Sequence, residues 1–252
     1  MRKLSLVIPC YNESATLRGI VEAALALKGG ELDLELLIVD DCSSDGSYAL
    51  AGELASEHGE VRVFRHDVNC GKGAALKTGF LAATGDYVGV QDADLEYDPL
   101  DYLRLLAFAE TGEAAVVYGS RYLHGSERGV LRWWHSAVNR FLTFLSNVFS
   151  DLALTDMETC YKLFRRDVIR RIAPSLREMR FGFEPEVTAR VAKLVRSEGL
   201  KMGEVAVSYR PRTFREGKKI GWRDGLKALW CILRYNLGCG DAAGRRYGDA
   251  GS

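Results

Sequence analysis

The feature that most constrains the fold is a regular alternation of short apolar segments with longer amphipathic ones in the first half of the chain. Short apolar runs predict strands over residues 4–8, 34–39, 61–65, 87–90 and 114–118. Helical patterns fill the intervals, and the first of these helices is expected to be capped by Ser14. Strands joined by helices of about 10–15 residues form βαβ crossovers. The sequence therefore predicts an α/β fold with a mostly parallel sheet.

The second half of the chain has a different pattern. We expect a long apolar and aromatic helical stretch, a turn with a short strand, a helix, another strand and a last helix, over residues 133–154, 155–164, 185–195, 205–209 and 222–235. Neither an internal repeat nor a linker divides the chain. We therefore expect one domain over residues 1–236, followed by a Gly/Ala/Arg-rich tail, 237–252, that is disordered.

Composition excludes several classes of function. The chain of 252 residues has 34 basic and 34 acidic side chains, so its net charge gives no reason to expect nucleic-acid binding. The six cysteines form no CxxC pair, which favours reduced thiols in a cytoplasmic protein over disulfides or zinc. No stretch approaches the roughly 20 apolar residues of a membrane-spanning helix. If the protein acts at a membrane, we expect it to lie on the surface.

Four polar clusters each follow a predicted strand, at residues 12–13, 40–41, 69–72 and 92–94. In an open parallel sheet the carboxyl ends of the strands lie along one edge, and ligands bind there. This convergence predicts a ligand site built from all four clusters.

Asp92, Asp94 and Glu96 follow the fourth strand at a spacing that lets their carboxylates point to one side. Hard oxygen ligands of this kind suit Mg²⁺ or Mn²⁺ and leave positions open for phosphates. The alternative is a solvated acidic turn before the next helix, with Asp98 as the N-cap. The three neighbouring clusters favour the metal site.

Asp40 and Asp41 end the second strand, where a carboxylate commonly binds a base or a ribose. Because Ser44 or Asp45 can cap the following helix, one of the two aspartates is expected to be available for a ligand. Lys72 lies between two glycines, and this loop either cradles phosphate at a helix N-terminus or is a simple glycine turn.

Residues 209–227 are rich in Arg and Lys and contain Gly217 and Gly221. Such a loop is suited to closing over phosphates or meeting anionic lipid headgroups, and a solvated charge run is the alternative. Arg121, at the end of the fifth strand, is a further phosphate candidate. Residues 133–154 fit a core helix or an interfacial helix equally well, and Arg128, Arg132 and Arg140 accompany them.

Four motifs occur in order: Pro-Cys-Tyr-Asn-Glu at 9–13, Val-Asp-Asp-Cys-Ser-Ser-Asp-Gly-Ser at 39–47, Asp-Ala-Asp-Leu at 92–95 and Gly-Ser-Arg-Tyr at 119–122. Together they resemble the family 2 inverting glycosyltransferases, in particular polyprenyl-phosphate sugar synthases of the dolichyl-phosphate mannose or glucose synthase type. The resemblance covers roughly residues 3–235. It implies a Rossmann-like fold of the GT-A type, with helices on both faces of the sheet.

The resemblance also implies substrates and residue roles. The donor would be a GDP- or UDP-sugar and the acceptor a dolichyl or undecaprenyl phosphate, used at the inner face of a membrane with Mg²⁺ or Mn²⁺. A separate membrane subunit is a further candidate partner. Asp92, Asp94 and Glu96 would hold the metal. The donor would contact Pro9, Tyr11, Asn12, Glu13, Asp40, Asp41, Lys72, Asp92 and Ala93; the acceptor phosphate would meet Arg121, Arg132, Arg212 and Lys218; and Asp94, Arg121, Arg212 and Lys219 would act in catalysis.

Residues 156–162, Asp-Met-Glu-Thr-Cys-Tyr-Lys, depart from the family pattern and place Lys162 where an Arg is common. The reaction implied is one displacement that inverts the anomeric carbon. A lipid phosphate acceptor is already anionic, whereas a hydroxyl acceptor needs a general base, for which Glu184 and Glu186 are the candidates. A non-catalytic nucleotide-sugar-binding module is a further alternative.

Overall fold

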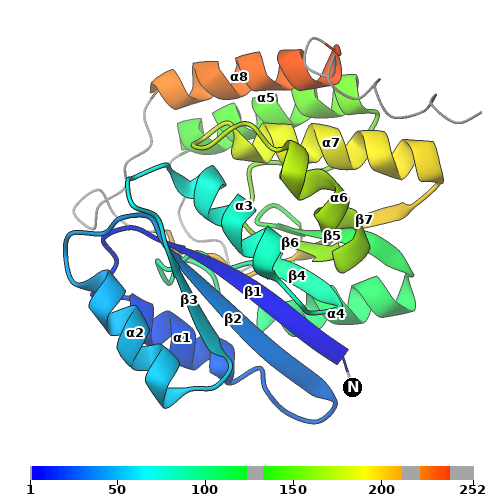
Figure 1. Ribbon diagram of the computed structural model, residues 1–252. Helices are drawn as coiled ribbons and strands as arrows, with labels where there is room; N and C mark the ends of the chain where they lie inside the picture. Colours follow the sequence, from blue (N-terminus) through cyan, green and yellow to red (C-terminus); the bar gives the residue numbers. More distant parts are fainter. Residues whose placement is uncertain (1, 124–132, 212–221, 239–252) are drawn as a thin grey trace, which may run out of the picture.

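A seven-stranded sheet in the order β3-β2-β1-β4-β6-β5-β7 organises the structure, a computed structural model that describes residues 2–123, 133–211 and 222–238 (Figure 1). Strands β1 to β4 are parallel, as are β5 and β7, whereas β6 runs antiparallel to β4 and β5. The expected mostly parallel sheet is confirmed. The strands are β1 (Arg2–Cys10), β2 (Leu32–Asp40), β3 (Val61–Arg65), β4 (Tyr87–Val90), β5 (Ala114–Ser120), β6 (Lys162–Arg165) and β7 (Lys201–Ala206).

Helices cover both faces of the sheet because side chains alternate along its strands. On β1, Leu6 and Ile8 belong to one apolar cluster and Val7 to the other. Helices α1, α2 and α4 pack in the first cluster, and α3, α5, α6, α7 and α8 in the second (Figure 1). The helices are α1 (Leu17–Leu25), α2 (Ser47–Glu57), α3 (Lys72–Ala82), α4 (Asp101–Thr111), α5 (Trp133–Ser150), α6 (Arg166–Ile172), the 3₁₀ turn η1 (Ala173–Ser175), α7 (Phe183–Glu198) and α8 (Trp222–Asn236).

Two local predictions were wrong, and one helix was not predicted. Ser14 does not cap α1, since the N-cap is Thr16 and the Ser14 N–H donates instead to Asp45 Oδ2 at 3.0 Å. The last strand is Lys201–Ala206 rather than 205–209, because its half-buried residues lack a clear apolar alternation. Helix α6 was not predicted, since its sequence RDVIRRI is mostly charged and only its pairing with the core buries Val168 and Ile169.

Within the described residues, no helix combines the length and apolarity needed to cross a bilayer. The five cysteines in this part of the chain are free thiols, as expected.

Candidate functional site at the carboxyl edge of the sheet

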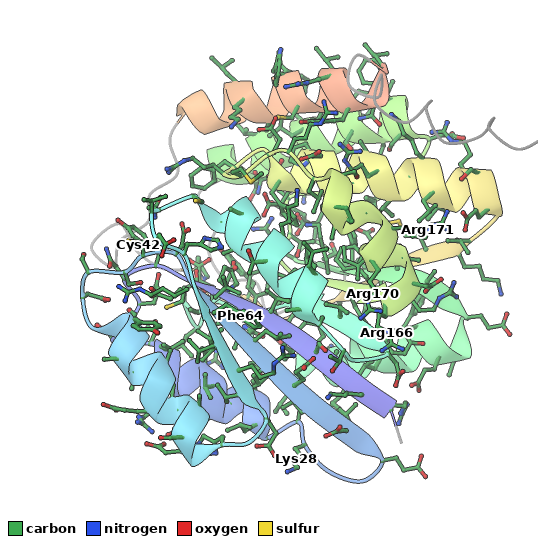
Figure 2. The ribbon with its side chains drawn as sticks, viewed as in Figure 1. Lys28, Cys42, Phe64, Arg166, Arg170 and Arg171 are labelled. Carbon is green, nitrogen blue, oxygen red and sulfur yellow. The ribbon has the colours of Figure 1, made fainter. Side chains whose placement is uncertain are left out.

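The loops after β1 and β2 are joined by hydrogen bonds, so the predicted donor-binding residues lie on one surface. The Asp41 N–H donates to Cys10 O at 2.8 Å, and the Ser44 N–H donates to Asn12 Oδ1 at 2.8 Å. Asn12 adopts a φ of 57°, which Asn tolerates better than most residues. Pro9 lies near the end of β1, and Tyr11 and Glu13 lie in the loop that follows it. Figure 2 shows Cys42 at this edge of the molecule and Lys28 at the opposite end.

The two aspartates that end β2 have different surroundings. Asp41 accepts hydrogen bonds from the backbone N–H of Cys70 (2.9 Å) and Gly71 (2.6 Å), and it pairs with His66 Nδ1 at 2.7 Å. Its carboxylate therefore holds the loop before α3. Asp40 is buried, and its Oδ1 lacks a hydrogen-bond partner in the described part of the chain. A buried acceptor of this kind is satisfied when a ligand donates to it.

One group within the described residues has the spacing of a metal site. It consists of Asp41, His66 and Cys70, whose possible ligand atoms all lie within 4.8 Å of one another. The hydrogen bonds to Asp41 already account for this proximity. His66 Nε2 lies 2.9 Å from Thr78 Oγ1, so both ring nitrogens are occupied. We assign the group to the architecture of the loop.

Lys72, the first residue of α3, points at the aspartate predicted to bind metal. Its Nζ lies 2.7 and 2.9 Å from the two carboxylate oxygens of Asp92 and 3.1 Å from Cys160 Sγ. Burial by itself raises the pKa of Asp92, but the ammonium of Lys72 and the Cys160 thiol outweigh it and lower that pKa below its ordinary value. In this arrangement Lys72 balances the charge of Asp92.

Glycine is required on both sides of Lys72. A Cβ on Gly71 would lie 2.4 Å from Met179 O, and one on Gly73 would lie 2.2 Å from Glu178 O. The Gly73 N–H donates to Met179 O at 2.8 Å. The two glycines thus allow the start of α3 to pack directly against the backbone at 178–179.

The remaining members of the predicted metal site lie beside Asp92 in sequence but do not form a tight ligand group with it. Asp94 Oδ1 accepts the Glu96 N–H at 3.2 Å, and Glu96 Oε2 accepts the Tyr209 hydroxyl at 2.8 Å. Ala93, between Asp92 and Asp94, is buried. Asp98 was expected to be the N-cap of the next helix, but the N-cap of α4 is Leu100, and Asp98 accepts the Leu100 N–H at 3.0 Å one turn before the helix begins.

Arg121, the phosphate candidate, is held in a buried ion pair. Its Nε and Nη2 donate to the two carboxylate oxygens of Asp156 at 2.7 and 2.8 Å, and its backbone N–H donates to the same group at 3.0 Å. Burial opposes the charge on Arg121, but Asp156 raises the pKa of the guanidinium well above its usual value. Sequence reasoning missed Asp156 because its partner lies 35 residues away.

The two candidate bases are separated by their surroundings. Glu186 is buried and accepts the N–H groups of Arg177 and Glu178 at 2.7–3.1 Å, and Arg190 pairs with it at 2.8 Å. Glu184 lies at the site, 3.8 Å from Lys72 Nζ. Glu186 therefore has a structural role, and Glu184 is the carboxylate within reach of the cluster.

Glu158 was not singled out by the sequence. Burial, and then the negative charge of Glu184, raise the pKa of Glu158 to about 8. Its Oε1 is a buried atom that lacks a hydrogen-bond partner within the described residues. Nearby, Lys162 is buried and donates to Met157 O at 3.2 Å, and burial lowers its pKa. Arg132, Arg212, Lys218 and Lys219, which were also predicted to act at the site, lie outside the described residues.

The sheet order, the helices on both faces and the polar loops at the carboxyl edge define a nucleotide-sugar transferase fold of the GT-A type. Solved structures of glucosyl-3-phosphoglycerate synthase from Mycobacterium tuberculosis share it. The complex with UDP has a TM-score of 0.69 at 21% identity, covering 94% of this chain and 80% of that one. The complex with Mn²⁺, UDP-glucose and phosphoglyceric acid has a TM-score of 0.67 at 21% identity, covering 94% and 80%.

The chain belongs to glycosyl transferase family 2, whose model matches residues 5–173. It is 30% identical over 259 residues to an undecaprenyl-phosphate mannosyltransferase of Micrococcus luteus, covering 94% of this chain and all of the relative. It is 28% identical to a dolichyl-phosphate beta-glucosyltransferase of Drosophila melanogaster, covering 94% and 76%. A similar enzyme of Trichomonas vaginalis is 26% identical over 81% of this chain, and the match spans 63% of that relative. The resemblance to polyprenyl-phosphate sugar synthases and the enzyme class are confirmed.

Proposed function

We propose that this chain transfers a hexose from a GDP- or UDP-sugar to a polyprenyl phosphate, with inversion at the anomeric carbon. The observation that carries the proposal is the state of the two candidate bases. Glu186 is occupied by backbone N–H groups, and Glu184 faces the ammonium of Lys72 at 3.8 Å. A site in which each candidate base is engaged suits an acceptor that is already anionic. The three relatives act on dolichyl or undecaprenyl phosphate.

A divalent cation fits the donor side of the site. Asp92 and Asp94 offer hard oxygen ligands at the end of β4, and Mn²⁺ is bound in solved structures with this fold. Bound there, Mg²⁺ or Mn²⁺ would neutralise the charge that develops on the leaving diphosphate. Glu96 is the third candidate ligand, and its Oε2 also accepts the Tyr209 hydroxyl. The ammonium of Lys72 contributes a fixed positive charge at the same carboxylate.

The nucleoside would bind across the loops after β1 and β2. The unsatisfied Asp40 Oδ1 is placed to accept a hydrogen bond from the base, with Tyr11, Asn12 and Glu13 on the neighbouring loop. Asp41 is proposed to support this region indirectly, through the loop that it holds before α3.

The acceptor phosphate would meet cationic groups at the far side of the cluster. Arg121 lies there, with its guanidinium carbon 5.2 Å from the centroid of the Tyr209 ring. The further candidates are Arg132, Arg212, Lys218 and Lys219. We also propose residues 1–236 as one catalytic domain, because a single sheet draws strands from Arg2 to Ala206. Because the proposed acceptor is a membrane lipid, we propose that the protein acts at the cytoplasmic face of a membrane. A separate membrane subunit is a candidate partner there.

The test is transfer of labelled hexose from GDP-mannose or UDP-glucose to undecaprenyl phosphate with Mn²⁺. Substitution of both Asp92 and Asp94 by Ala should lower turnover by about 100-fold or more, since removing a preorganised electrostatic group costs this much. Absence of product with each donor, beside an active control enzyme, would overturn the proposal.

Glu184→Gln separates this proposal from the one alternative that an observation supports, transfer to a hydroxyl. Of the two candidate bases, Glu184 is the one that lies at the site, so a hydroxyl acceptor would require it as the base. Loss of about 100-fold or more in Glu184→Gln would indicate a hydroxyl acceptor. Retention of most of the activity with undecaprenyl phosphate supports the lipid phosphate.

A further inference from the structure

His66 lies between two parts of the candidate site, although it is not among the residues expected to touch the donor. It directly follows β3, and its backbone N–H donates to Asp40 O at 2.9 Å. Its side chain is 15% exposed, and that of Asp41 beside it is 4% exposed. A hydrogen bond sheltered from water in this way is stronger than one at the surface, so His66 is suited to holding its neighbours in place.

Both ring nitrogens of His66 have partners, and the partners belong to different elements. Nδ1 lies 2.7 Å from Asp41 Oδ1, just after β2, and Nε2 lies 2.9 Å from Thr78 Oγ1 on α3. A carboxylate accepts hydrogen bonds and cannot donate them, so we assign the proton of the neutral ring to Nδ1. Nε2 then accepts the Thr78 hydroxyl. The ring therefore connects the loop after β2 with α3.

The two partners of this ring belong to opposite ends of the proposed donor subsite. Asp41 adjoins Asp40, whose buried Oδ1 is proposed to accept a hydrogen bond from the base. Thr78 lies on the helix that begins at Lys72, and the ammonium of Lys72 contacts both carboxylate oxygens of Asp92, where the diphosphate is expected. Because a helix moves largely as one body, a contact at Thr78 also restrains Lys72.

The loop between the two ends is held by the same carboxylate. Asp41 accepts the backbone N–H groups of Cys70 at 2.9 Å and Gly71 at 2.6 Å, the two residues that precede α3. These bonds fix where α3 begins, and the contact between His66 and Thr78 fixes how the helix is directed from there. Start and direction together determine the position of the first side chain of the helix.

We propose that His66 is a positioning residue that sets the distance between the base end of the donor subsite, at Asp40, and the diphosphate end, at Lys72. A nucleoside diphosphate contacts both ends at once only when their spacing matches its own length, and a displacement of about 1 Å is enough to weaken such a fit. Each end can still bind its own part of the molecule when the spacing is wrong. This inference rests on the proposed function for the donor, and it requires nothing of the acceptor.

The test compares a whole nucleotide with its two parts by calorimetry. The full chain, Thr78→Val and His66→Asn are each titrated with UDP, uridine and pyrophosphate in the presence of Mg²⁺, and with GDP and guanosine in parallel. Thr78→Val keeps the shape of the side chain but removes the hydroxyl, and His66→Asn keeps a donor for Asp41 but is too short to reach Thr78. Both variants should bind the nucleotide about tenfold more weakly. They should bind the nucleoside and pyrophosphate within about twofold of the unsubstituted chain.

Thr78→Ser is the matched control, because it retains the hydroxyl that the His66 ring accepts and should bind the nucleotide as the unsubstituted chain does. The double variant His66→Asn/Thr78→Val should lose no more affinity than either single variant, since both substitutions remove the same link. Urea unfolding verifies that each variant is folded under the conditions of the titration.

The positioning role is overturned by unchanged affinity for the nucleotide in both single variants, by equal losses for the nucleotide and its parts, or by an equal loss in Thr78→Ser. Equal losses for the parts would assign His66 to the fold of the two ends themselves. Binding of neither UDP nor GDP by the unsubstituted chain overturns it together with the proposed donor. The expected pattern of affinities without hexose transfer to undecaprenyl phosphate refutes the proposed function and leaves this inference intact.

Discussion

The pair of Arg121 and Asp156 allows a sharp test of whether a charge at the site serves the fold or the reaction. The side chain of Arg121 is 9% exposed and that of Asp156 is fully buried. Replacing either partner alone leaves the other charge buried without its counterion. Replacing both removes the charges together.

The expected magnitudes follow from this geometry. Breaking a buried ion pair by removing one partner costs about 3–5 kcal/mol, so Arg121→Met and Asp156→Leu should each lose that much unfolding free energy. For a protein of this size that corresponds to roughly 6–20 °C in melting temperature. Arg121→Met/Asp156→Leu should lie within about 2 kcal/mol of the unsubstituted chain, since apolar replacement of a whole pair is often neutral.

Urea unfolding of the four proteins at pH 7 measures these differences, and the double-mutant cycle should give a coupling of about 4 kcal/mol or more. Hexose transfer by the double variant then decides the role of Arg121. Restored stability with activity still lost assigns the guanidinium to substrate, whereas recovery of both assigns it to the fold. Single variants that each cost less than about 1 kcal/mol would refute the reasoning, because the pair would then behave as a solvated one.

Three further predictions follow from other contacts. Asp40→Asn should weaken the binding of nucleoside diphosphates, measured by calorimetry, by about tenfold or more and change the unfolding free energy little. Asp41→Asn should instead lower the unfolding free energy by about 2–3 kcal/mol, because one amide oxygen cannot accept all three of the contacts that the Asp41 carboxylate makes. Gly73→Ala should cost about 1–3 kcal/mol in urea unfolding, because the new Cβ meets Glu178 O at 2.2 Å. A carboxyl whose pKa rises from 4.5 to about 8 on folding stabilises the fold below pH 4.5 and loses that contribution as the pH rises through 8. Glu158→Gln, always neutral, should therefore gain in stability relative to the unsubstituted chain between pH 5 and pH 9, and an unchanged difference would contradict the assigned pKa.

The fold was largely predictable because its signals are local. Runs such as residues 61–65 and 87–90 are short, apolar and bounded by polar loops, and the structure gives strands with these same limits. Helix α6 was missed because its amphipathic pattern spans only seven residues, four of them charged. The edge strand β7 was displaced because its side chains are only partly buried and carry little alternation.

The pairing of charges within the site was not predictable, because it depends on contacts between distant segments. The sequence placed Lys72 among the phosphate-binding candidates, but only the fold shows it against Asp92, 20 residues away. It also left Asp40 and Asp41 as equal candidates. Their different roles arise because Asp41 faces the backbone at 70–71, which belongs to the loop after a different strand.

The segment before α7, Glu178 and Met179, contacts both α3 and α8. On one side its Met179 carbonyl accepts the Gly73 N–H, which fixes the start of α3 and hence Lys72. On the other side Glu178 holds Tyr235 and Lys227 of α8. Glu178 and Met179 therefore contact both α3, which carries the charge beside Asp92, and α8. A shift of this segment must move both helices, so Gly73→Ala should reduce hexose transfer, because it displaces the start of α3 and with it Lys72.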